Sequence, residues 1–131
     1  MPIEYRIDHA RRLVLAHGQG VVTHRDFYMY QRHVWSNPDV DGYNELMDMT
    51  DVTTIDLSAP ENIRQLAELG ADMDNPFMPS KLAILAPGDE AFGLGRMYQT
   101  HRSLAAGATK SVGVFRSRAE AFAFLGIPDP R

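Results

Sequence analysis

Hydrophobic and polar residues alternate at the start of the chain, which is the pattern of a strand with one buried face. The hydrophobic positions of this first strand are Ile3, Tyr5 and Ile7. A second apolar run begins at Leu13, and Gly18 and Gly20 are expected to end it. Because the period of two indicates strands and the polar residues 9–12 indicate a turn, the two runs predict an antiparallel hairpin.

The next apolar residues have helical spacing. Phe27, Tyr30 and Val34 fall on one face of a helix, which predicts a helix over residues 24–36. Thr23, with an acid three residues later, is a suitable cap for its first turn. The Asn-Pro pair at 37–38 ends it, because the residue before a proline is disfavoured in helical conformation.

Strands and helices then alternate to the end of the chain. Strands are predicted at 43–49, 81–86 and 111–115, and helices near 61–73, 90–105 and 117–126. The order β-β-α-β-α-β-α-β-α predicts one α/β domain over residues 1–131. We expect a mixed, mostly parallel sheet of about five strands, flanked by about four helices.

Two of these helices are preceded by the same four-residue pattern. Ser58 stands three residues before Glu61, and Ser117 three residues before Glu120. A serine followed by glutamate at this spacing is a capping box, in which the two side chains bind the first free N–H groups of a helix. The pattern predicts that both serines cap helices.

The composition of the chain excludes several kinds of functional site. The chain has 131 residues, no cysteine and a net charge of −4. Disulfides, zinc–thiolate sites and cysteine nucleophiles are therefore excluded. The acidic balance argues against nucleic-acid binding, which needs a basic face. No apolar run approaches the roughly 20 residues of a membrane helix, so we expect no membrane insertion and a cytoplasmic protein.

The segment 48–59 resembles part of a known family. It reads Asp-Met-Thr-Asp-Val-Thr-Thr-Ile-Asp-Leu-Ser-Ala. The sulfate-transporter and anti-sigma-factor-antagonist (STAS) domain has a strand ending Asp-Leu-Ser, then Asp-Ser-Ser-Gly at a helix start. The matching positions are Asp48, Val52, Ile55, Asp56 and Ser58. The closing strand and helix of the family are similar to Phe115, Arg116, Ala121, Phe122 and Leu125.

The chain departs from this motif at two positions. Leu57 replaces the first serine of the motif, and Ala59, followed by Pro60, replaces the glycine. The longer opening hairpin and residues 35–56 look closer to stand-alone bacterial domains called SpoIIAA-like or STAS/Sec14-like. That resemblance covers nearly the whole chain and implies a fold, but no assigned biochemical role.

The resemblance implies a regulatory module that works through a protein partner. In the sigma-factor antagonists, a kinase that is also an anti-sigma factor phosphorylates the second serine of the motif, which corresponds to Ser58. Asp56, Pro60 and Glu61 would belong to the same contact surface. A phosphate there would meet the free N–H groups of a helix start. Helix capping is the alternative reason for a serine at this position.

A second hypothesis rests on aromatic and methionine residues that fall on predicted helices. Such side chains adapt to apolar ligands and to partner surfaces. We therefore consider a groove for a small apolar ligand or a lipid, although these residues also suit ordinary core packing. The candidate groove residues are Tyr28, Trp35, Phe92, Met97 and Tyr98.

Other chemistry has little support in the sequence. The glycines at 88 and 93 have P-loop spacing but lack the following lysine, and no serine lies in a Gly-x-Ser-x-Gly elbow. The five histidines show no metal-ligand spacing. We therefore predict no cofactor, no metal and no enzymatic activity. A homodimer through a twofold surface patch is compatible with the sequence, which does not specify one.

Overall fold

The computed structural model describes residues 2–131, which form five strands, four α-helices and one short 3₁₀ helix. The elements in chain order are β1 (Ile3–Asp8), β2 (Leu13–Thr23), α1 (His24–Trp35), η1 (Pro38–Val40), β3 (Asn44–Asp56), α2 (Glu61–Asp72), β4 (Lys81–Leu85), α3 (Asp89–Leu104), β5 (Ser111–Phe115) and α4 (Arg118–Leu125). The predicted order of strands and helices is confirmed.

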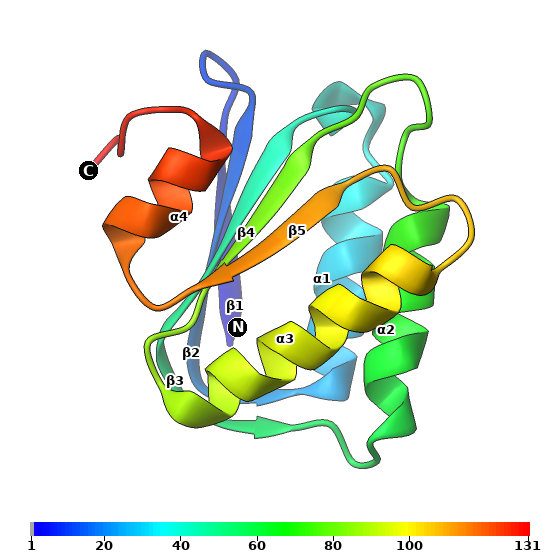
Figure 1. The fold of residues 1–131 in the computed structure, drawn as a ribbon, viewed down its shortest axis with the longest axis vertical. Helices are drawn as coiled ribbons and strands as arrows, with labels where there is room; N and C mark the ends of the chain where they lie inside the picture. The colour runs from blue at the N-terminus through cyan, green and yellow to red at the C-terminus, as the bar shows by residue number, and fades with distance from the viewer. Residues whose placement is uncertain (1) are drawn as a thin grey trace.

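The strands form one sheet in the order β1-β2-β3-β4-β5 (Figure 1). The opening hairpin is antiparallel, and every later neighbour pair is parallel. The predicted mixed, mostly parallel sheet is therefore confirmed. Among residues 2–131, no helix has both the length and the apolar character needed to cross a membrane.

Helices cover the two faces of the sheet unequally. In Figure 1, α1, α2 and α3 lie on one face, and α4 lies alone on the other. The larger core, between the sheet and the three helices, includes Val14, Tyr30, Met47, Met49, Leu82 and Ile84. The smaller core, under α4, includes Leu13, Leu46, Leu85, Phe122 and Leu125. Side chains alternate between the two cores along β3 and β4, as expected for strands buried on both faces.

Two helix starts follow the sequence prediction. The Thr23 hydroxyl accepts the N–H of Asp26 at 3.2 Å, and the Asp26 carboxylate accepts the N–H of Thr23 at 2.9 Å. At α4, the Ser117 hydroxyl accepts the N–H of Glu120 at 3.2 Å. This helix ends at Gly126, whose φ of 74° is the left-handed conformation that glycine adopts without strain.

Two strands are longer than predicted. β2 continues past its glycines to Thr23, and β3 continues past Met49 to Asp56. The two extensions pair with each other, with register shifts next to Gly18 and Gly20. The glycines were expected to end β2, but here they accommodate bulges within it.

The prediction that Ser58 caps α2 is wrong. The helix begins at Glu61, its N-cap position is Pro60, and no side chain caps it. Ser58 instead lies in the loop before the helix with a φ of 66°, and its N–H donates to the Asp56 carboxylate at 3.0 Å. An aspartate that binds the N–H two residues later forms a local turn, and this turn displaces the helix start.

The two serines should respond differently to substitution by alanine. We expect Ser117→Ala to lower the free energy of unfolding by about 1 kcal/mol, because it removes a helix cap. Ser58→Ala should change the free energy of unfolding by less than about 0.5 kcal/mol. Serine and alanine both have a Cβ, so the left-handed conformation at this position strains both alike. Urea unfolding of both variants measures the difference, and equal losses would contradict this assignment of the caps.

Candidate functional site

A cavity of about 110 Å³ lies between the sheet and helices α1, α2 and α3. Most of its wall is hydrophobic. The hydrophobic lining residues include Phe27, Trp35, Met47, Met49, Ile55, Leu57, Ile63, Leu66, Met73, Met78, Leu82, Ile84, Ala91 and Leu94. Small-molecule sites are typically lined in this way, with a few polar groups that fix the orientation of the ligand.

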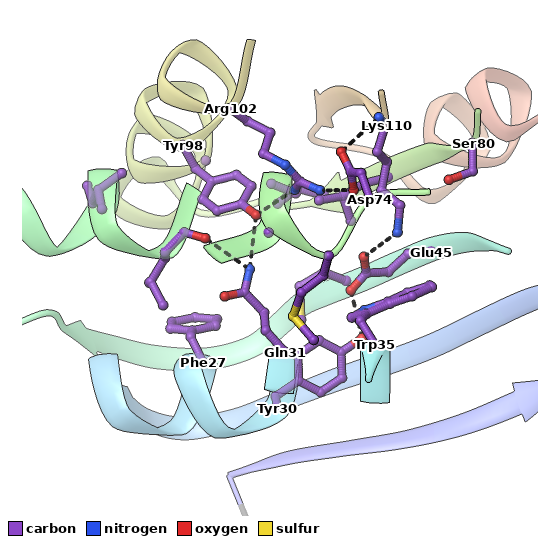
Figure 2. Close-up of a pocket in the computed structure, with 18 of the residues that line it drawn as sticks. Phe27, Tyr30, Gln31, Trp35, Glu45, Asp74, Ser80, Tyr98, Arg102 and Lys110 are labelled. Atoms are coloured by element: carbon purple, nitrogen blue, oxygen red, sulfur yellow. Dashed lines mark hydrogen bonds and ion pairs between the residues drawn. The ribbon is translucent and has the colours of Figure 1, made fainter. Parts of the chain in front are cut away.

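Polar residues gather at one end of the cavity (Figure 2). They include Tyr30, Gln31, Glu45, Asp74, Tyr98, Arg102 and Lys110. This end lies at the start of β3 and β5 and at the last turns of the three helices. The opposite end, which includes Ile55, Leu57 and Ile63, lies at the finish of β3 and the start of α2.

Glu45 and Lys110 form a buried ion pair at the polar end. The Lys110 Nζ lies 3.4 Å from the Glu45 Oε1, and each side chain is only 7% exposed. The Tyr30 hydroxyl donates to the other carboxylate oxygen at 2.7 Å. The Lys110 ammonium also lies 3.4 Å from the centre of the Trp35 ring, where a cation–π interaction stabilises its charge. Tyr30 therefore stabilises the carboxylate of this pair, and Trp35 stabilises its ammonium group.

Asp74 and Arg102 form a second buried ion pair. The Arg102 Nη2 donates to the Asp74 Oδ1 at 2.5 Å, and the two side chains are 4% and 3% exposed. The other carboxylate oxygen accepts the backbone N–H groups of Thr109 and Lys110, both at 3.0 Å. The carboxylate of Asp74 thus joins α3 to the segment that leads into β5.

The Tyr98 hydroxyl connects this second pair to α1. It accepts the Arg102 Nη1 at 2.7 Å and the Gln31 Nε2 at 3.0 Å. Gly70 provides the space for this contact, because a Cβ there would lie 2.8 Å from the guanidinium carbon of Arg102. Glycine weakens a helix, and this close approach explains why one is present in the last turn of α2.

Burial controls the protonation of these groups. Burial raises the pKa of Tyr98 to about 12, against the positive charge of Arg102. Burial also raises the pKa of Tyr30 well above its usual range, and the Glu45 carboxylate raises it further. Both phenols are therefore neutral at physiological pH. For Lys110, burial lowers the pKa of the ammonium, and the Glu45 carboxylate partly offsets this.

The structure divides the predicted groove residues. Trp35 and Tyr98 line the cavity. Tyr28, Phe92 and Met97 do not belong to its wall. The Phe92 ring packs against the larger core and lies 4.2 Å below the Arg116 guanidinium, and Met97 is exposed. Tyr28 lies near Arg32 on α1. All three lie on helices that cover the cavity, but on other faces of them.

The four residues of the predicted partner surface lie together at the other end of β3. All four are exposed, and they run from the last residue of β3 through the following loop to the first residue of α2; they are Asp56, Ser58, Pro60 and Glu61. Leu57 and Ile63, which flank this loop, belong to the cavity wall. The Ser58 loop and the cavity are therefore neighbours, although none of the four predicted residues lines the cavity.

The sequence prediction missed the four charged residues at the polar end. Sequence signals could have located two of them. Glu45 lies two residues before Met47 and four before Met49, so all three side chains face the same side of β3. Arg102 follows Tyr98 by four residues on α3, so the two share a helix face. Lys110 and Asp74 lie in loops, and no local pattern marks them as buried.

Comparisons with known proteins give a fold but no activity. No protein-family model matches the chain, and no curated protein matches it either. Among solved structures, it is similar to an uncharacterised protein of the DUF3478 family from Shewanella loihica PV-4, described as having a SpoIIAA-like fold. The two share 16% sequence identity with a TM-score of 0.59, over 94% of this chain and 93% of the other. This chain has a SpoIIAA-like fold.

The SpoIIAA-like fold confirms the architecture that the resemblance to STAS domains implied. At this level of identity the likeness extends to the arrangement of strands and helices and no further. The Shewanella protein is itself uncharacterised, so the likeness suggests no ligand, partner or reaction. Proposals about function must therefore come from the side chains of this SpoIIAA-like domain.

Gly70→Ala should destabilise the protein although alanine favours helices. The added Cβ would lie 2.8 Å from Arg102 atoms, and Asp74 and Tyr98 prevent the guanidinium from moving away. Such overpacking costs about 1–3 kcal/mol, more than the gain of up to about 1 kcal/mol from helix propensity. Gly93→Ala is the matched control, because nothing lies within 4 Å of that Cβ. Chemical unfolding should show opposite signs, and stabilisation by both would contradict the close contact at Gly70.

Proposed function

We propose that this domain binds a small, mainly apolar molecule between its sheet and helices α1, α2 and α3. The observation that supports this function is the cavity of about 110 Å³, with its hydrophobic wall and single polar end. An engineered apolar cavity of about 150 Å³ binds benzene, so a cavity of this order admits a ligand of similar size. Binding needs no reactive group, which agrees with a non-enzymatic role.

The wall favours an adaptable site. Met47, Met49, Met73 and Met78 all line the cavity. Methionine side chains are flexible and polarisable, so they adjust to ligands of different shape at small cost. The four buried charges are already paired with each other, so a mainly apolar ligand need not compete for them.

Toluene is a suitable first probe of this proposal. A ligand at ten times its Kd stabilises the folded state by roughly 1.4 kcal/mol, which corresponds to a Tm increase of about 3–6 °C for a domain of this size. We expect such an increase for the wild type. Met47→Trp and Met49→Phe should reduce it, because their larger side chains occupy the cavity.

Leu104→Phe is the control for these cavity variants. It adds an aromatic ring at a position that is 78% exposed and outside the cavity, so it should keep the toluene response. An unchanged Tm in the wild type at saturating toluene would contradict the proposed function. An equal response in all four proteins would show that toluene binds elsewhere.

We also propose that the Ser58 loop is a contact surface regulated by phosphorylation, as in the antagonists that this chain resembles. The supporting observation is that Ser58 is exposed and is not used as a helix cap. A phosphate there would add negative charge beside Asp56 and Glu61, which would repel an acidic partner surface. The loop also adjoins the cavity through Leu57 and Ile63, so a ligand and a partner would act on neighbouring groups.

Ser58→Asp tests the contact surface. We expect a partner retained by the wild type in a pull-down from native cells to bind at least tenfold more weakly to Ser58→Asp. Ser103→Asp, at an exposed serine near the end of α3, is the matched control and should retain the partner. Mass spectrometry of the protein from the same cells should find phosphate on Ser58. A partner that ignores Ser58→Asp, with Ser58 unmodified, would contradict the second function.

A further inference from the structure

Several buried polar atoms at the polar end of the cavity have no hydrogen-bond partner among residues 2–131. They are the Arg102 Nε, the Gln31 Oε1 and the Trp35 Nε1. All three side chains line the cavity. The indole N–H of Trp35 lies near enough to Tyr30 to affect that phenol, but it makes no hydrogen bond of good geometry. In Figure 2 the free oxygen of Gln31 lies on the side of Phe27, away from Tyr98.

The Tyr98 hydroxyl adds a further donor. Its oxygen already accepts two N–H groups, from Arg102 and Gln31. The phenol is neutral at physiological pH and keeps its proton, which has no acceptor among residues 2–131. Buried polar groups in folded proteins nearly always find partners. The polar end therefore presents donors from Arg102, Trp35 and Tyr98 together with one acceptor on Gln31.

The charges at this end restrict the ligand. Lys110 is paired with Glu45, and Arg102 with Asp74, so the four buried charges cancel. A carboxylate or an ammonium group added here would be a fifth charge without a counterion. Burying an unpaired charge is far more costly than burying a neutral polar group. The charge balance therefore favours an uncharged ligand.

A hydroxyl group matches the free atoms. It both donates and accepts, so a single group can donate to the Gln31 oxygen and accept the proton of the neighbouring Tyr98 hydroxyl. A carbonyl group accepts but cannot donate, which would leave Gln31 unpaired. A purely apolar ligand would leave every one of these atoms unpaired.

We propose that the cavity selects an uncharged alcohol or phenol of about six to eight non-hydrogen atoms, a size near that of benzene in a comparable cavity. The hydroxyl would lie among Gln31, Tyr98 and Arg102, and the hydrocarbon part would point toward Ile55 and Leu57. This inference rests on the proposed binding function and adds to it the identity of the polar group of the ligand.

Four probes with one scaffold test the proposal: benzyl alcohol, toluene, benzoate and benzylamine, which is protonated at neutral pH. Calorimetric titration of the wild type should show benzyl alcohol binding at least tenfold more tightly than each of the other three. Equal affinity of toluene and benzyl alcohol would overturn the inference but leave the proposed function intact. Tightest binding of benzoate or benzylamine would also overturn it. No binding of any probe would overturn both.

Gln31→Met and Tyr98→Phe identify the contacts. Each removes polar atoms at nearly constant volume, and each should reduce the preference for benzyl alcohol over toluene at least fivefold while toluene still binds. Either variant alone decides the question if the other does not fold. Gln99→Met is the matched control, because Gln99 donates to Val112 O outside the cavity. A preference unchanged in both cavity variants would overturn the proposed position of the hydroxyl.

Discussion

The buried carboxylate of Asp74 holds together the segments that close one end of the cavity. It accepts the Arg102 guanidinium of α3 and two backbone N–H groups ahead of β5. A buried carboxylate at the end of α2 is tolerated only because each of its oxygens has a hydrogen-bond or ion-pair partner. Removal of Arg102 or Asp74 alone would leave an isolated buried charge, which typically costs about 3–5 kcal/mol. The pair is therefore better understood as fixing the positions of α2, α3 and β5 than as a net source of stability.

This arrangement places the polar end of the cavity at the beginning of the parallel strands. In most open α/β sheets, ligands bind outside the carboxyl ends of the strands. Here the carboxyl end of β3 leads to the exposed Ser58 loop, whereas Glu45 lies at its start. One strand thus contributes to both proposed surfaces, the internal one that would hold a small molecule and the external one that would contact a partner. Because Leu57 and Ile63 adjoin both surfaces, a ligand in the cavity and a partner at the loop would interact through shared packing.

The sequence was a better guide to the fold than to the site. Helix starts at Thr23 and Ser117 depend on residues three apart, so a local pattern was enough to predict them. The cap at Ser58 failed because a competing turn at Asp56 satisfies the backbone first. Trp35 and Tyr98 were proposed as groove residues from their residue type and their place on predicted helices. Lys110 and Glu45 lie 65 residues apart, and nothing in the neighbourhood of either residue indicates that they will meet. A charged residue is normally exposed, so only the three-dimensional structure reveals the burial of Lys110 and Asp74, which no local pattern marks.

The unequal length of the strands affects how a molecule bound in the cavity would enter and leave it. β4 pairs with β3 only from Glu45 to Asp48, so the later part of β3 forms a two-stranded ribbon with β2. The Ile55 N–H donates to the Glu90 carboxylate at 2.9 Å, an exposed contact that ties this ribbon to α3. A two-stranded ribbon is marginal without support, and its opening would break no pairing between β3 and β4. Because Ile55 forms part of the cavity wall, the exchange rate of a bound molecule would follow the local opening of this ribbon, which amide hydrogen exchange at residues 52–56 would reveal.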